Sequence, residues 1–270
     1  MEIVLIVIIA IIVIAVKAHF NSPDVKGRRG EDQLERKLDT QGIWGREGKT
    51  LRNIYVPRVG GDTTEIDLLY ITTKGLFVLE SKNYAGYIFG SESSRNWTVT
   101  LYAGKTWYGG KKVEKHQFYN PVWQNRTHIK HLTEYLKSEA LFSNIPTFSV
   151  IAFSDRGSLK DVTVNSDNVY VCYKSGLSRT IRDIWENSPD ALSQENVERI
   201  YNKLLPLTNK DAAEKQQHVQ AISNRYSSTE TCPWCGGKLV LRTAKKGNNA
   251  GNQFYGCANY PKCRYTKKID

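Results

Sequence analysis

Residues 65–82, EIDLLYITTKGLFVLESK, carry the strongest structural pattern in the chain. Two apolar runs, one ending at Ile71 and one beginning at Leu76, flank a short turn that contains a glycine, which is typical of a β-hairpin. If Ile71 pairs with Leu76, the same register places Asp67 directly opposite Glu80. The sequence therefore predicts two opposed carboxylates on neighbouring strands.

The same register places Glu65 opposite Lys82, and the two-residue repeat of a strand puts all four charged side chains on one face. Opposed Cβ atoms lie roughly 4.5–5.5 Å apart, where like charges destabilise a sheet. Residues 76–79 are apolar on both faces, as in a central strand, and a buried unpaired cluster of charge is costly. The ordinary alternative is a solvated acidic face. The pattern favours a divalent cation held by Asp67 and Glu80.

Strand and helix patterns continue around the hairpin. Strands are expected at 51–56, 97–102, 105–108, 147–153 and 168–173, and helices at 28–38, 120–142 and 196–204. Asn120-Pro121 is a strong helix start, an N-cap followed by proline. Gln124 and His128 lie four residues apart in this helix and can face one site, although a satisfied helix histidine is the more ordinary role for His128. The polar segment 206–230 is expected to be a linker, helical in part at most.

Charge is concentrated at the C-terminal end of the chain. Eight Lys or Arg residues follow Cys232 against Asp270 alone, which gives this tail +7 of the formal net charge of +11. Such a basic segment predicts a polyanionic partner, nucleic acid first and an anionic lipid surface second.

The N-terminal residues form an apolar run. Residues 3–16 contain no charge and would span about 21 Å as a helix, which is short of a bilayer core of about 30 Å. Lys17 can snorkel, and the next three residues can lengthen the span. A cleaved secretory signal is the alternative, but Glu2 stands where basic residues are expected. Residues 1–20 are therefore predicted to be a membrane anchor.

Basic residues follow this run closely. They are Lys17, Lys26, Arg28 and Arg29. The positive-inside rule then places the rest of the chain on the cytoplasmic side of a single-pass anchor.

Four short motifs occur in a fixed order along the chain. They are GRRGE at 27–31, TEID at 64–67, ESKNYAG at 80–86 and NPxxQ at 120–124. With these motifs, residues 27–140 resemble the nuclease-related domain, a member of the restriction-endonuclease-like PD-(D/E)xK superfamily. The resemblance implies an α/β domain over 27–205, with a mixed β-sheet flanked by helices. Ile66 departs from the proline in the superfamily's name.

The resemblance also implies a catalytic site. In it Asp67 and Glu80 bind Mg²⁺ or Mn²⁺, Glu31 assists, Lys82 orients or activates the attacking water, and Gln124 supports the site. Hard carboxylate oxygens suit these ions better than zinc. A cation held in this way lowers the pKa of bound water and neutralises charge on phosphate oxygens. The implied reaction is phosphodiester hydrolysis.

Four cysteines near the C-terminus follow metal-site spacing. Cys232, Cys235, Cys257 and Cys263 are arranged as C-x2-C-x21-C-x5-C, which suits a tetrahedral structural zinc site. Two disulfides are the alternative, but a cytoplasmic chain stays reduced. The fifth cysteine, Cys172, lies in an apolar strand and is expected to be core.

Residues 231–268 resemble the C-terminal four-cysteine zinc ribbon of type IA topoisomerases, which implies binding of single-stranded DNA. Aromatic and basic residues interleave here, as expected for base stacking beside phosphate contacts, although some of the rings must build the small core. The expected DNA-binding residues are Trp234, Arg242, Lys245, Lys246, Phe254, Tyr255, Tyr260 and Lys262.

The sequence thus predicts a membrane-anchored, metal-dependent nuclease whose zinc ribbon holds DNA. A non-catalytic DNA-tethering protein on a nuclease-like fold is the main alternative, and a lipid-binding tail is another. An intact set of Asp67, Glu80 and Lys82 favours the enzyme, because a degenerate relative is expected to lose one of them.

Deletion of residues 1–20 should move the protein from the membrane fraction to the soluble fraction, because the apolar run is the predicted anchor. Fractionation of cells followed by immunoblotting measures this, and the remaining chain should keep its circular dichroism spectrum. Recovery of a shortened mature chain from the external medium would instead establish a secretory signal.

Overall fold

The computed structural model describes residues 48–58, 61–105, 108, 111–137, 144–208, 212–246 and 249–269. The anchor expected over 1–20, the helix expected over 28–38 and Glu31 lie outside the described residues. Among the helices that are described, none is long and apolar enough to span a bilayer. The chain divides into two compact units, and the second consists of Pro57–Thr63 with Asn209–Asp270.

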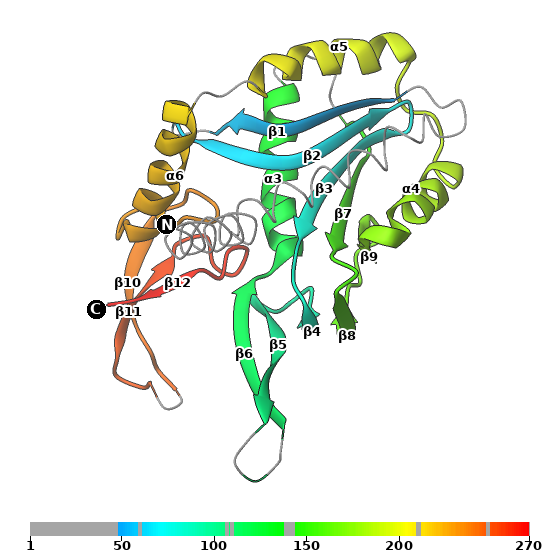
Figure 1. Ribbon diagram of the computed structural model, residues 1–270. Helices are drawn as coiled ribbons and strands as arrows, with labels where there is room; N and C mark the ends of the chain where they lie inside the picture. The colour runs from blue at the N-terminus through cyan, green and yellow to red at the C-terminus, as the bar shows by residue number, and fades with distance from the viewer. Residues whose placement is uncertain are drawn as a thin grey trace, which may run out of the picture. The chain divides into compact units, whose positions relative to one another are not determined.

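The first unit is built on a five-stranded sheet in the order β1-β2-β3-β7-β9 (Figure 1). The strands are β1 (Lys49–Pro57), β2 (Thr63–Thr72), β3 (Gly75–Lys82), β7 (Thr147–Phe153) and β9 (Val169–Tyr173). β2 and β3 are antiparallel, whereas β3, β7 and β9 run parallel to one another. β3 is therefore the central strand, as its apolar run predicts.

The β2–β3 hairpin has the predicted register. Ile71 pairs with Leu76, and the ladder runs from Thr72–Gly75 to Leu68–Leu79. Gly75 is required at the turn because its φ is +131° and an added Cβ would lie 2.2 Å from a neighbouring backbone oxygen. The ladder ends at Leu68–Leu79, one position before Asp67 and Glu80.

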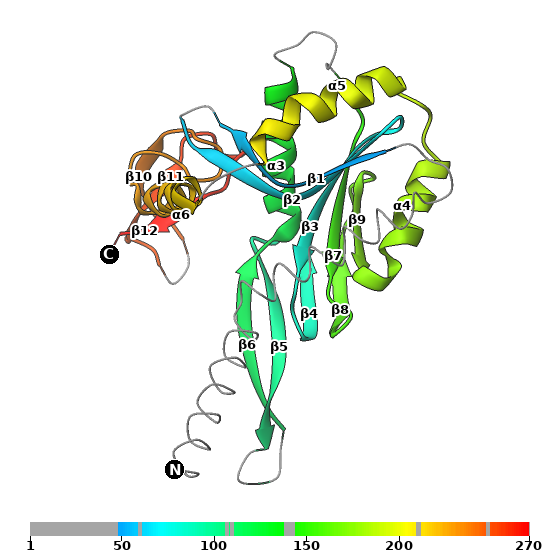
Figure 2. The same cartoon turned by 45° about the horizontal axis from the view of Figure 1, so that its top comes forward.

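Helices cover both faces of this sheet (Figures 1 and 2). α3 (Pro121–Leu136) and α5 (Gln194–Leu204) pack against one face, where Val78 of β3 is buried. α4 (Leu177–Glu186) packs against the other face, where Phe77 and Leu79 are buried. Since alternate residues of a strand share a face, Glu80 and Lys82 lie on the face of Val78, beneath α3.

α3 begins at the predicted cap. The Asn120 side chain accepts hydrogen bonds from the backbone N–H groups of Val122 and Trp123, and Pro121 occupies the first helical position. The helix ends at Leu136, and residues 138–142 of the longer predicted helix lie outside the described chain. Short 3₁₀ turns span Lys174–Gly176 and Leu205–Leu207.

A second, four-stranded sheet in the same unit has the order β6-β5-β4-β8. Its strands are β4 (Gly86–Ser91), β5 (Asn96–Lys105), β6 (Lys111–Tyr119) and β8 (Gly157–Thr163). β5 and β6 continue past β4 and β8 as a two-stranded ribbon (Figures 1 and 2). The sequence pattern predicted only β5 correctly here. It placed a strand at 105–108, whereas Tyr108 lies in a turn and the next strand begins at Lys111.

The second unit contains α6 (Ala212–Ser227) and a three-stranded sheet of β10 (Leu239–Thr243), β11 (Gln253–Cys257) and β12 (Thr266–Lys268). The helix occupies most of the segment predicted to be a linker. Leu239 of β10 pairs with Cys257 of β11. This pairing brings Cys257 close to the first two cysteines, which precede β10.

Candidate active site and cysteine cluster

A buried ion pair lies at the end of β3. Lys82 Nζ is 2.6 Å from Glu80 Oε1, and the side chains of Lys82 and Glu80 are 17% and 2% exposed. Both project from the sheet face that α3 covers. Two opposite charges removed from water together are tolerated only when they are paired and hydrogen-bonded.

Helix α3 supplies the remaining contacts to this pair. Lys82 Nζ donates to Gln124 Oε1 over 3.0 Å. One turn further, His128 Nε2 lies 3.4 Å from Glu80 Oε2, and His128 Nδ1 lies 2.7 Å from Thr64 Oγ1. Gln124 and His128 thus face one site, as their spacing predicts, and His128 is a buried helix histidine rather than a surface one.

The electrostatics keep both groups charged. Burial opposes ionisation of Glu80, but Lys82 and His128 together lower the pKa of its carboxyl to about 2. Burial likewise acts to lower the pKa of Lys82, but Glu80, helped by Asp67, raises it above the usual lysine value. Each ion thus stabilises the charged form of the other, and Lys82 is an ammonium at neutral pH.

Asp67 lies beside this pair on β2. It is half-buried, and its Oδ2 accepts a hydrogen bond of 2.9 Å from the backbone N–H of Ser81. The carboxylate also contributes to the raised pKa of Lys82. Glu65, which the register placed opposite Lys82, accepts a hydrogen bond from Tyr55 instead.

The two carboxylates fit a divalent cation in their chemistry. Glu80 Oε2 is buried and makes no hydrogen bond within the described part of the chain; His128 Nε2 lies 3.4 Å away. The buried oxygen of Glu80 and the half-buried carboxylate of Asp67 on the neighbouring strand are both hard oxygen donors. Glu31, the third acid of the predicted site, lies outside the described residues.

Two asparagines fix α3 over the site. Asn125 Nδ2 donates to Val78 O over 2.8 Å and to Ser149 Oγ over 2.9 Å, which ties the helix to β3 and β7. Asn120, besides capping the helix, donates to the backbone oxygens of Ser91, Glu92 and Ser94. Neither contact was predicted, because each joins a single polar side chain to a distant backbone group.

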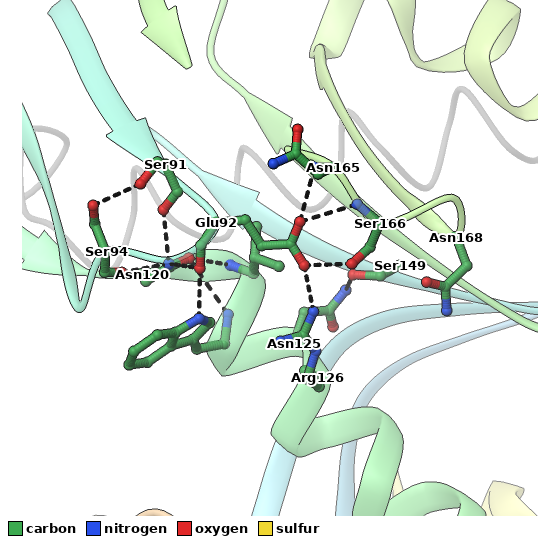
Figure 3. Close-up of polar contacts among 12 residues, drawn as sticks. Ser91, Glu92, Ser94, Asn120, Asn125, Arg126, Ser149, Asn165, Ser166 and Asn168 are labelled. Carbon is green, nitrogen blue, oxygen red and sulfur yellow. Dashed lines mark hydrogen bonds and ion pairs between the residues drawn. The ribbon is translucent and has the colours of Figure 1, made fainter. Parts of the chain in front are cut away.

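Figure 3 shows the polar network around the start of α3. The Glu92 carboxylate accepts hydrogen bonds from Arg126 of α3 and from the backbone and hydroxyl of Ser166. Burial acts to raise the pKa of Glu92, but these donors, with the backbone N–H of Asn165, lower it to about 2. The network joins the β4–β5 turn, α3 and the loop after β8, so it positions the helix that carries Gln124.

A basic residue missed by the sequence analysis contacts Asn83, the residue that follows Lys82. Ser154 N donates to Lys82 O over 2.8 Å, and Arg156 Nη2 donates to Asn83 Oδ1 over 2.9 Å. The parallel pairing of β3 with β7 brings the turn after β7 to the end of β3. No local pattern signals this arrangement, because it depends on strands about 70 residues apart.

The four predicted cysteines converge in the second unit. Their sulfur atoms all lie within 4.8 Å of one another, with 3.7 Å between Cys232 and Cys263 and 3.4 Å between Cys235 and Cys257. A tetrahedron of sulfurs about 2.3 Å from zinc has edges of about 3.8 Å. All four are free thiols, so the cluster fits Zn²⁺ and not two disulfides.

The predicted DNA-binding residues of the ribbon separate into two groups. Trp234 and Tyr255 pack against the cysteine core, so their rings are partly buried. Tyr260 is 60% exposed, and the Arg242 guanidinium lies 5.9 Å from its ring centroid. Lys245, Lys246 and Lys262 are exposed, and Phe254 is half-buried.

Two family profiles match separate parts of the chain. The profile of the nuclease-related domain matches residues 26–154, and that of the topoisomerase DNA binding C4 zinc finger matches residues 229–270. An uncharacterized protein of Bacillus anthracis is 32% identical over 229 residues, which are 84% of this chain and 96% of that protein. The chain belongs to the nuclease-related domain family and carries a topoisomerase-type zinc ribbon.

Topoisomerases match shorter parts of the chain. DNA topoisomerase 1 of Methanocaldococcus jannaschii is 51% identical over 39 residues, covering 14% of this chain and 4% of that enzyme. DNA topoisomerase 1 of Archaeoglobus fulgidus is 29% identical over 157 residues, covering 58% of this chain and 21% of that enzyme. No solved structure matches the chain significantly.

Replacement of Lys82 by Met should destabilise the fold by about 3–5 kcal/mol at pH 7, because it leaves Glu80 charged and buried without its partner. In the native pair the lowered pKa of Glu80 gives stability that is present above about pH 4.5 and lost as pH falls through about 2. Without Lys82, burial should raise the pKa of Glu80, so that Glu80 takes up a proton more readily. The loss of unfolding free energy relative to the wild type should therefore shrink on mild acidification.

Urea unfolding followed by circular dichroism at pH 7.5 and 5.5, with zinc chelated at both, measures this difference. The matched Glu80→Gln/Lys82→Met variant, which carries no buried charge at the pair, should recover most of the loss. An equal deficit of Lys82→Met at both pH values would contradict the buried-pair account.

Metal analysis should find about one zinc per chain, and Cys257→Ser should unfold the cysteine module alone, because such small modules gain their folding energy from the metal. Limited proteolysis and elemental analysis are the measurements. Cys172→Ser, at the half-buried cysteine of β9, is the matched control and should retain the zinc. A disulfide between Cys232 and Cys235 in the native protein would rule out the zinc site.

Proposed function

We propose that this protein is a metal-dependent nuclease that hydrolyses phosphodiester bonds of DNA. The observation that carries the proposal is the Glu80–Lys82 pair, which is buried with one carboxylate oxygen unsatisfied and lies beside Asp67. Membership of the nuclease-related domain family supports the same reaction. A structural role explains the pair poorly, because apolar side chains of the same volume would serve stability as well or better.

Asp67 and Glu80 are the residues that would hold Mg²⁺ or Mn²⁺. Such an ion, when bound, supplies charge neutralisation and acidifies a water molecule. Lys82 carries a raised pKa, so it keeps its proton and acts as a hydrogen-bond donor to a phosphate oxygen or to the attacking water. It is poorly suited to remove a proton. Gln124 accepts from the Lys82 ammonium and so fixes its direction.

The ribbon is the proposed DNA-holding module. Tyr260 offers an exposed ring, and Arg242, Lys245, Lys246 and Lys262 offer charge for phosphates. Stacking on exposed rings favours unpaired bases, so single-stranded DNA is the proposed ligand. Residues 1–20, as a single-pass anchor, would hold this activity at the cytoplasmic face of a membrane, a proposal supported by the sequence pattern alone.

Asp67→Ala should abolish DNA cleavage and leave DNA binding largely intact, because the ribbon supplies much of the affinity. Labelled single- and double-stranded DNA incubated with Mg²⁺ or Mn²⁺ gives the cleavage measurement, and anisotropy gives binding. Lys82→Ala should reduce turnover about 100- to 1000-fold, the usual cost of removing one preorganised donor at a reacting centre. Asp183→Ala, at an exposed carboxylate of α4, is the matched control and should cleave normally.

Two outcomes would overturn the proposal. Wild-type protein that binds DNA but cleaves none with either metal would favour the non-catalytic tethering protein. Cleavage by Asp67→Ala at the wild-type rate would show that the nuclease activity belongs to another site or to a contaminant.

A further inference from the structure

The four-stranded sheet has one buried and one exposed face. Ile88 of β4 and Trp97 and Val99 of β5 point into the core, where they pack with Phe153. The alternate residues point outward, and three of them are aromatic: Tyr87 is 52% exposed, Phe89 37% and Tyr102 61%. A group of large exposed rings on one sheet face is a feature of interaction surfaces.

Strand register places these rings close together. Tyr87 pairs with Thr100 of β5, so Tyr102 is its diagonal neighbour on the same face, and Phe89 lies two residues along β4. Diagonal and next-but-one positions on a sheet are about 7 Å apart. The three rings therefore form a diagonal track across β4 and β5, with the half-buried Thr98 and Thr100 beside them.

Lysines accompany the rings. Lys160 Nζ lies 5.1 Å from the Tyr87 ring centroid, and the exposed Lys115 of β6 pairs with Thr100, which places it in the same row. One acid, Asp161, pairs with Phe89. The β5–β6 hairpin contains four lysines and one glutamate between residues 102 and 117, so its charge complements a polyanion.

We propose that this aromatic face, defined by Tyr87, Phe89, Tyr102, Lys115 and Lys160, binds a single-stranded segment of nucleic acid by base stacking. Exposed rings beside phosphate-binding charge on a sheet are the features by which proteins hold single strands. The proposal rests on the proposed nuclease function and deepens it, since it gives the substrate a second contact surface apart from the zinc ribbon.

Spacing favours a single strand over a duplex. Bases in a duplex are stacked on one another at a rise of about 3.4 Å, so they cannot each cover a ring when the rings lie about 7 Å apart. A single strand can splay its bases onto separate rings. Threonine hydroxyls beside the rings suit a polar ligand.

The aromatic face is close in sequence to the candidate active site. β4 begins four residues after Lys82, and the Tyr84 ring in this short connection packs 4.3 Å from the Phe118 ring of β6. The β-sheet that would hold the nucleic acid is thus connected to the candidate active site by a short, packed segment of the chain.

The test uses the full chain with its zinc, carrying Asp67→Ala so that DNA stays intact. Anisotropy of a labelled thymidine oligonucleotide of about 16 nucleotides, the upper site size of one single-strand-binding fold, measures affinity. The Tyr87→Ser/Phe89→Ser/Tyr102→Ser variant should bind it at least about 10-fold more weakly, with duplex binding unchanged. Tyr87→Phe/Phe89→Tyr/Tyr102→Phe should bind normally, as should Tyr226→Ser, which removes an exposed ring of α6.

Photo-cross-linking of a bromodeoxyuridine oligonucleotide locates the contact independently of the ribbon. Cross-links in residues 86–105 that disappear in the serine variant are expected. Cross-links confined to 229–270 with unchanged affinity overturn the proposal. So does a serine variant that loses binding to anionic phosphatidylserine vesicles but not to DNA, or one that changes only its oligomeric state in sedimentation.

Cleavage assays distinguish the aromatic-face proposal from the proposal that the protein is a nuclease. If the serine variant loses single-strand binding while wild-type protein cleaves nothing, the aromatic face stands and the catalytic proposal fails. If cleavage depends on Asp67 but the serine variant binds and cross-links like wild type, the nuclease stands and the aromatic face is wrong.

Discussion

The first unit depends on the removal of one carboxylate and one ammonium from water together. Glu80 and Lys82 lose their hydration beneath α3, and their mutual attraction offsets this cost only while the geometry is held. The helix is part of that geometry, because Gln124 accepts from Lys82 and Asn125 fastens the helix to β3. The position of α3 over the sheet and the chemistry of the site therefore rest on the same few contacts.

Much of this arrangement could be predicted from local sequence. The hairpin register follows from two apolar runs and one turn, and the start of α3 follows from Asn120-Pro121, since both are decided by residues close in the chain. The roles of the site residues stay predictions. The β6 strand was missed because most of it is exposed on both faces, so its side chains show no alternation. Arg156 was missed because only the long-range pairing of β3 with β7 brings it into contact with Asn83.

The cysteine module shows a similar limit. Cysteine spacing is a local signal, and it was sufficient to predict the cluster. It could not decide which aromatic rings support the core, because that choice depends on the pairing of β10 with β11 across a long loop. Trp234 and Tyr255 pack inward and Tyr260 remains exposed. The resemblance and the interleaving of rings with basic residues predicted all three as DNA contacts, with some of the rings expected to build the core.

The extent of the folded unit differs from the extent of the family match. The match ends at residue 154, directly after β7, yet β9 pairs with the edge of β7, and α5 contributes Val197, Ile200 and Leu204 to the core. A fragment cut at the end of the match would present an unpaired parallel edge and a bare apolar face, both of which promote self-association. The smallest piece expected to remain soluble extends through α5, about 50 residues beyond the recognisable motif region.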